Sequence, residues 1–153
     1  IHFIIESHLD HTYLDGAAMM LGNGSPVIAL TLRYDRLDNF WFVLFHELAH
    51  VVLHLAFDKT RYFLEDLDSI GDSIEEKEAD RWATDGLIDP ETWRASGLSM
   101  YSKPSEIIRF ANSLRINHAI PAGRLRKESG DYKIFYNLVG KDEVRKLFWS
   151  ECE

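Results

Sequence analysis

The sequence predicts an α+β domain in which a small antiparallel sheet packs against a central helix and several further helices. Two observations lead to this prediction. β-Branched and aromatic residues gather in short runs within the first 34 residues, whereas most of the later chain carries helical patterns. Between these regions lie residues 40–54, FWFVLFHELAHVVLH, which contain no Gly or Pro and are apolar on most sides of a helix. A helix of this kind belongs in the middle of a domain.

The strands are predicted from β-rich runs and from the turn residues between them. Gly22-Asn23-Gly24-Ser25 is a strong hairpin signal. Pro26 is tolerated after it because it opens the next strand. The predicted strands are residues 1–6, 16–21, 26–34 and, after the central helix, 61–64.

The helices are predicted from capping residues and apolar spacing. Asp38 is the expected N-cap of the central helix, and Ser73 with Glu76 forms a capping-box pattern at the start of the next. We expect no helix over residues 116–126, which hold Pro121 and Gly123. The later predicted helices are residues 73–86, 90–96 capped by Asp89, 105–114 and 141–149.

Length and composition limit the classes of protein to which the chain can belong. A length of 153 residues fits one domain, and a formal net charge of -8 without a Lys/Arg run argues against nucleic-acid binding by this segment. The apolar runs are too short to span a membrane. The single cysteine, Cys152, suits a cytoplasmic protein. Because the chain starts at Ile1, within a predicted strand, we expect a fragment whose N-terminal module is missing.

The central helix contains an HExxH motif at residues 46–50. Residues four apart stack on one helix face, so His46 and His50 can offer two imidazoles to one metal ion. Glu47 lies beside them, where its carboxylate can take a proton from a metal-bound water. Two core histidines satisfied by hydrogen bonds are the alternative. Three ionisable groups on so apolar a helix are costly unless something compensates them, which favours the metal.

A third ligand is expected on the next helix. Glu76 and Asp80 share one face there, so Glu76 can bind the ion while Asp80 orients a ligand histidine. Glu78 is the alternative ligand, although an ideal helix turns it about 200° away from Glu76. His54 lies two turns from His46, about 12 Å along the axis, and is too distant to bind the same ion easily, so we expect it at the helix end or next to a ligand residue.

These two motifs together resemble the ImmA/IrrE family of zinc-dependent metallopeptidase-like domains. The resemblance rests on FHELAHVVLH at residues 45–54 and on ExxAD at 76–80, and it extends over roughly residues 16–126. It implies a zincin-like minimal core, gluzincin-like in its ligands, with one Zn²⁺ on His46, His50 and Glu76 and with Glu47 as catalytic base. The chain departs from the family pattern at Asp80, where Asn is commoner, and in residues 84–90.

The resemblance implies two functions, and the residues leave a third open. The first is a zinc-dependent metallo-endopeptidase that hydrolyses a peptide bond in a specific regulatory protein, such as a repressor. The second is an antitoxin or transcription-regulation component that uses the fold as a binding scaffold, because family members are often fused to a helix-turn-helix domain or paired with a toxin. The third is a structural domain without metal. Hydrolysis also needs a donor to the oxyanion, for which the candidates are Tyr34, His118, Arg124 and Tyr132.

Overall fold

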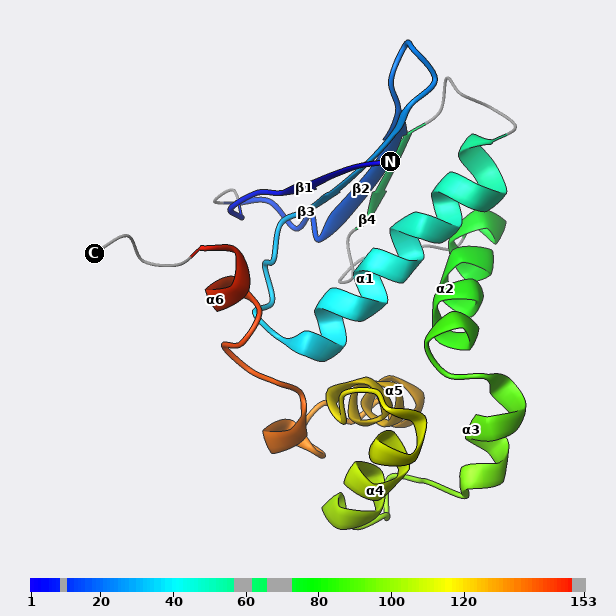
Figure 1. The fold of residues 1–153 in the computed structure, drawn as a ribbon, viewed down its shortest axis with the longest axis vertical. Coiled ribbons are helices and arrows are strands. Elements are labelled where there is room, and N and C mark those ends of the chain that lie inside the picture. The colour runs from blue at the N-terminus through cyan, green and yellow to red at the C-terminus, as the bar shows by residue number, and fades with distance from the viewer. Residues whose placement is uncertain (9–10, 57–61, 66–72, 150–153) are drawn as a thin grey trace. The chain divides into compact units, whose positions relative to one another are not determined.

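The computed structural model describes residues 1–8, 11–56, 62–65 and 73–149 and has the predicted α+β architecture (Figure 1). Its contacts divide the chain into two compact units. The first unit comprises residues 1–34 and 42–84, and the second comprises residues 35–41 and 85–153. The single domain expected over residues 1–153 stays a prediction.

The first unit contains a four-stranded sheet with the order β1-β3-β2-β4 among the described residues. The hairpin confirms its turn signal, because the Leu21 N–H donates to the Ser25 carbonyl and Gly24 takes a φ of +81°. Strand β4 confirms the strand expected at residues 61–64, of which Arg61 lies outside the described residues. The strands are β1 (His2–Ile5), β2 (Gly16–Met20), β3 (Pro26–Leu30) and β4 (Tyr62–Glu65).

This sheet is mixed, so the expectation of a wholly antiparallel sheet is wrong for one pair of strands. Strand β2 runs antiparallel to both β3 and β4, whereas β1 pairs with β3 in parallel. After the hairpin, β3 lies between β1 and β2. It runs antiparallel to β2 and in the same direction as β1. The sequence signals of β1 describe a strand but not its neighbour.

Two helical segments of the first unit carry the residues of interest. Helix α1 (Leu37–Ala49) continues directly as a π-helix, η1 (His50–Leu55), against which β2 packs. Helix α2 (Ile74–Leu87) starts as predicted, because the Glu76 N–H donates to Ser73 Oγ at 3.1 Å. The buried apolar residues of these helices and of the sheet in the same unit include Ala18, Ile28, Val43, Ala49, Leu55, Ala79 and Ala83.

The elements of the second unit, among the described residues, are helices, and one isolated β-bridge joins Arg36 and Lys141. Its apolar core contains Ile107, Ala122, Leu125 and Leu138, with Trp93, Leu98 and Phe135 packed against them. Asp89 caps α3 as predicted by accepting the Thr92 N–H at 2.8 Å. The elements are α3 (Pro90–Ser96), α4 (Pro104–Leu114), α5 (Ala119–Ser129), the 3-10 helix η2 (Tyr136–Leu138) and α6 (Arg145–Phe148).

The predicted N-cap role of Asp38 is wrong, because α1 begins one residue earlier, at Leu37. The N–H groups of Leu37 and Asp38 donate to the carbonyls of Gly140 and Val139, so backbone groups satisfy the start of the helix. The Asp38 carboxylate is therefore available to pair with Arg36 and Arg126.

Helix α5 was not predicted, because Pro121 and Gly123 indicated a break. Pro121 is in the first turn of the helix, where its missing N–H costs little. Gly123 is required by close packing, since a Cβ at this position would lie 2.5 Å from Asp38 Cβ. Both residues that resemble helix breakers are compatible with the helix for these reasons.

The last helix is shorter than the predicted residues 141–149. Asp142 donates its N–H to the Asp35 carbonyl, and Lys141 forms a β-bridge with Arg36. The Asp35 carboxylate then accepts the N–H groups of Val144 and Arg145, so the helix begins at Arg145. Among the described residues, no helix has the length and apolar character needed to cross a membrane.

Candidate metal centre

The two histidines of the HExxH motif lie side by side on successive turns. His46 is in the last turn of α1, and His50 opens η1. Their Nε2 atoms are 2.9 Å apart, and both residues are only 1% exposed. Burial lowers the pKa of His50, which favours the neutral imidazole that a metal ion requires.

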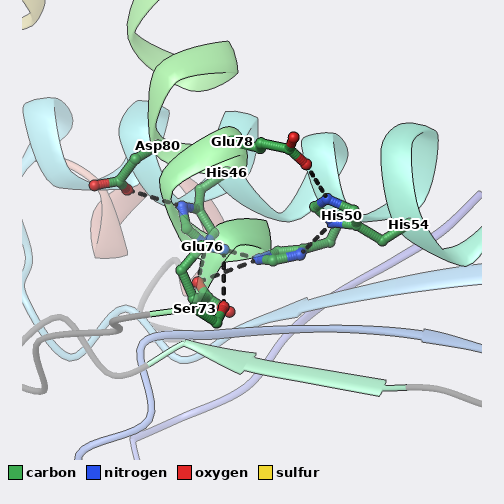
Figure 2. A network of polar contacts seen from close by, with 7 residues as sticks. All are labelled: His46, His50, His54, Ser73, Glu76, Glu78 and Asp80. Atoms are coloured by element: carbon green, nitrogen blue, oxygen red, sulfur yellow. Dashed lines mark hydrogen bonds and ion pairs between the residues drawn. The ribbon is translucent and has the colours of Figure 1, made fainter.

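Glu76 reaches the same point from α2 (Figure 2). Its Oε2 atom lies 3.0 Å from His46 Nε2 and 3.4 Å from His50 Nε2. When no cation is bound, an added proton lets His46, and then His50, donate to Glu76; these hydrogen bonds lower the pKa of the Glu76 carboxyl, so this group is ionised. One ligand atom from each of these three residues therefore meets at one place, within 4.8 Å of the others.

Asp80 determines which nitrogen of His46 is available. Its Oδ1 atom lies 3.1 Å from His46 Nδ1, one helical turn beyond Glu76. A neutral imidazole has one N–H, so when Nδ1 donates to Asp80, Nε2 keeps its lone pair. That lone pair then faces acceptor atoms of Glu76 and His50. Lone pairs that face one another at such short distances repel. The three atoms can therefore stay together only with a cation or an added proton between them.

The chemistry and spacing of these atoms fit zinc. Two imidazole nitrogens and a carboxylate oxygen are a common ligand set for catalytic zinc. In a tetrahedral site with metal–ligand distances of about 2.0–2.1 Å, neighbouring ligand atoms lie about 3.3 Å apart. The three distances here are 2.9, 3.0 and 3.4 Å. His46, His50 and Glu76 could therefore bind one metal ion.

Glu47, the glutamate of the motif, is fully enclosed. It is 0% exposed and lies against the sheet, where a Cβ added to Gly16 in β2 would be 2.5 Å from Glu47 Oε1 and 2.7 Å from Val43 Cγ1. Only a residue without a side chain leaves room for this carboxylate. The sequence indicated Gly16 as the start of a strand but gave no signal for this contact.

A comparison with known families identifies the chain at this point. The model of the IrrE N-terminal-like domain, peptidase family M78, matches residues 4–124. This chain belongs to the IrrE N-terminal-like family. The match begins further toward the N-terminus than the region of resemblance at residues 16–126 and ends at nearly the same place. No curated protein matches the sequence significantly.

This member of the IrrE N-terminal-like family has two further residues beside the candidate ligands, His54, expected at the helix end or next to a ligand, and Glu78. His54 Nδ1 lies 3.0 Å from His50 Nδ1, and His54 Nε2 lies 3.3 Å from Glu78 Oε2 (Figure 2). Glu78, the alternative third ligand, thus meets His54, while Glu76 meets His46 and His50. From β4, the Phe63 ring stacks on that of His50 with centroids 4.0 Å apart.

The four candidate oxyanion donors have other contacts. Tyr34 lies under the Arg33 guanidinium, whose Cζ is 4.9 Å from the ring centroid. Arg124, in the second unit, pairs with Glu128 at 2.8 Å and donates to the Ile88 carbonyl. His118 is half-buried just before α5, and the Tyr132 carbonyl accepts from Arg126. The role of each as an oxyanion donor stays a prediction.

Proposed function

We propose that the chain is a zinc-dependent metallo-endopeptidase that hydrolyses a peptide bond in a specific regulatory protein, such as a repressor or a toxin. The observation that carries this proposal is the convergence of His46 Nε2, His50 Nε2 and Glu76 Oε2 beside a buried glutamate. Membership of a peptidase family supports the same class of reaction.

Each residue of the centre has a separate task in this proposal. His46, His50 and Glu76 would hold the zinc ion, which would act as a Lewis acid toward the scissile carbonyl and lower the pKa of the attacking water. Glu47 takes the proton of that water and delivers it to the leaving amine. Asp80 holds the His46 ring in the tautomer whose Nε2 faces the centre. Gly16 leaves the space that the Glu47 carboxylate occupies, because any side chain at this position would displace it.

The substrate is proposed to bind as an added strand. Strand β4 is at the end of the described strand order and pairs with β2 on one side. The other side of such a strand offers backbone N–H and C=O groups to an extended peptide. Phe63 of β4 stacks on the ring of His50, a proposed metal ligand. A peptide paired with β4 would therefore lie near the metal site. A substrate in this position is a flexible or unfolded segment of its protein.

Glu47→Gln is the variant that tests the proposal. Zinc-loaded wild type and variant are incubated with a peptide library made from a digested bacterial proteome, and new peptide ends are identified by mass spectrometry. We expect cleavage by the wild type, a rate lower by about 100-fold to 10,000-fold in the variant, and one zinc per chain in both proteins.

Two results contradict hydrolysis. If Glu47→Gln cleaves as fast as the wild type, Glu47 is not the base. If neither protein cleaves the library or the products of neighbouring genes, yet both bind zinc and one of those products, the fold acts as a regulatory scaffold.

A further inference from the structure

His54 is a buried polar residue that the proposed reaction does not use. It is 8% exposed, and each of its ring nitrogens meets a polar atom. Nδ1 lies 3.0 Å from His50 Nδ1, and Nε2 lies 3.3 Å from Glu78 Oε2 (Figure 2). His54 therefore connects a proposed metal ligand with a carboxylate on α2.

The protons along this chain of contacts can be assigned from the Glu78 end. A carboxylate only accepts hydrogen bonds, so the single N–H of a neutral His54 belongs on Nε2. His54 Nδ1 then accepts, and the N–H of His50 belongs on its Nδ1. His50 Nε2 is left with its lone pair, and this is the atom that meets His46 and Glu76.

His54 lies next to His50 because residues four apart share one helix face, and the π-helix also turns His54 toward the line of His46. An ideal α-helix turns residue 54 about 80° away from residue 46. A π-helix takes about 4.4 residues per turn, so four residues of it after His50 bring His54 back nearly into line with His46. η1 covers residues His50–Leu55, where this change is needed.

Aromatic packing holds both rings of the pair. The Phe63 ring is stacked on His50 at an angle of 19° and lies 5.3 Å from the His54 ring centroid. The two imidazoles are 5.0 Å apart between centroids. Rings packed in this way have little freedom to rotate, so the hydrogen bonds between them are maintained.

We propose that His54 is a positioning residue, which together with Glu78 fixes His50 in the tautomer that presents Nε2 to the metal. The inference rests on the proposed metal function. The tautomer of His46 is fixed by a direct contact with Asp80. The tautomer of His50 is fixed by His54, whose own ring contacts Glu78. Because the Glu78 side chain is 58% exposed, its share of the effect is smaller than that of His54.

The test measures zinc affinity by competition with a chromophoric chelator. His54→Phe keeps an aromatic ring and removes the acceptor, and we expect affinity to fall about 10-fold to 100-fold. His54→Asn offers an amide oxygen near the position of Nδ1 and is expected to recover affinity to within about threefold of the wild type. Glu78→Ala should lose about threefold to fivefold, and Glu6→Ala, a matched exposed carboxylate in the same unit, should lose nothing.

A second measurement does not depend on zinc. Ring ¹⁵N NMR of the metal-free wild type should show His50 with its proton on Nδ1, and His54→Phe should lose this preference while keeping a cooperative thermal transition. The positioning role of His54 is overturned if the His50 tautomer is unchanged in His54→Phe. It is also overturned if folded His54→Phe binds zinc within twofold of the wild type. Failure of the wild type to bind zinc overturns the proposed function instead, and the NMR result still decides the hydrogen-bond assignment.

Discussion

Each unit of this protein buries a group of ionisable side chains, and the two groups are balanced differently. In the second unit, Asp38 accepts from Arg36 at 3.0 Å and lies 3.6 Å from Arg126. Burial raises the pKa of Asp38 and lowers that of Arg126, although each charge stabilises the other. The charges of this group are therefore compensated by neighbouring side chains of opposite sign from the chain itself.

The first unit instead brings acceptor atoms together. With the His46 proton on Asp80, lone pairs of His46, His50 and Glu76 point to one place. A cation from outside the chain satisfies this arrangement. Ionisable groups that are balanced by their own neighbours stabilise the fold, whereas groups whose lone pairs converge on one point can bind a cation. The following predictions separate these two roles.

The largest effect is expected for Glu76→Ala. Loss of one of three protein ligands should weaken zinc binding about 1,000-fold or more, or roughly 4 kcal/mol, as judged by the 10–16 kcal/mol that complete structural zinc sites supply. Chelator competition measures the affinity, and urea unfolding in excess chelator should show little change in stability. Unaltered zinc affinity would place the metal on other residues.

Asp38→Asn should reduce stability and leave zinc affinity unchanged, the reverse of Glu76→Ala. Removing the carboxylate leaves Arg126, which is 3% exposed, beside Arg36 without this negative charge. We expect the free energy of unfolding to fall by about 3 kcal/mol in urea titrations, while the folded protein keeps its zinc affinity. A variant with full stability but weakened zinc binding would end the distinction between the two groups.

Gly16→Ala tests whether the sheet positions the Glu47 carboxylate for its proposed role as base. The new methyl group must displace Glu47, since its Cβ would lie 2.5 Å from Oε1. A misplacement of about 1 Å costs on the order of 100-fold in rate, so hydrolysis should fall by about this factor with zinc retained. Gly22→Ala is the control, because no atom outside its neighbours lies within 4 Å of its added Cβ. Equal loss in both variants would contradict the contact.

The smallest effect is expected for Ser73→Ala at the start of α2. Ser73 Oγ accepts the Glu76 N–H, and loss of an N-cap side chain costs about 1 kcal/mol. Thermal or urea unfolding measures this loss. Ser105→Ala, at an exposed position in the first turn of α4, serves as the comparison and should change stability by less than about 0.5 kcal/mol. A cap loss no larger than that of the control would contradict the capping role.

Local chemistry made part of the site predictable. The spacing of four in HExxH and in ExxAD places His46 with His50, and Glu76 with Asp80, on common helix faces before any tertiary contact is known. The Ser73 and Asp89 caps were predictable for the same reason, because a cap involves residues within one turn.

Long-range contacts could not be predicted in this way. Helix α5 tolerates Gly123 because Asp38 packs against it from a segment 85 positions earlier in the sequence. The start of α1 is satisfied by carbonyls of Val139 and Gly140, which removed the need for the expected side-chain cap. Such partners are distant in the chain and leave no mark in the local pattern.

The sequence by itself determined that His46 shares a helix face with His50 and that Glu76 shares one with Asp80, because helical periodicity fixes these faces, but it left Glu78 as an alternative ligand. Only the tertiary structure decided that Gly16 packs against Glu47, that His54 meets Glu78 of α2, and that β1 runs parallel to β3. These features depend on how separate segments pack and on where protons are placed between buried nitrogen and oxygen atoms. Packing and proton position are properties of the folded chain, and no single segment carries them.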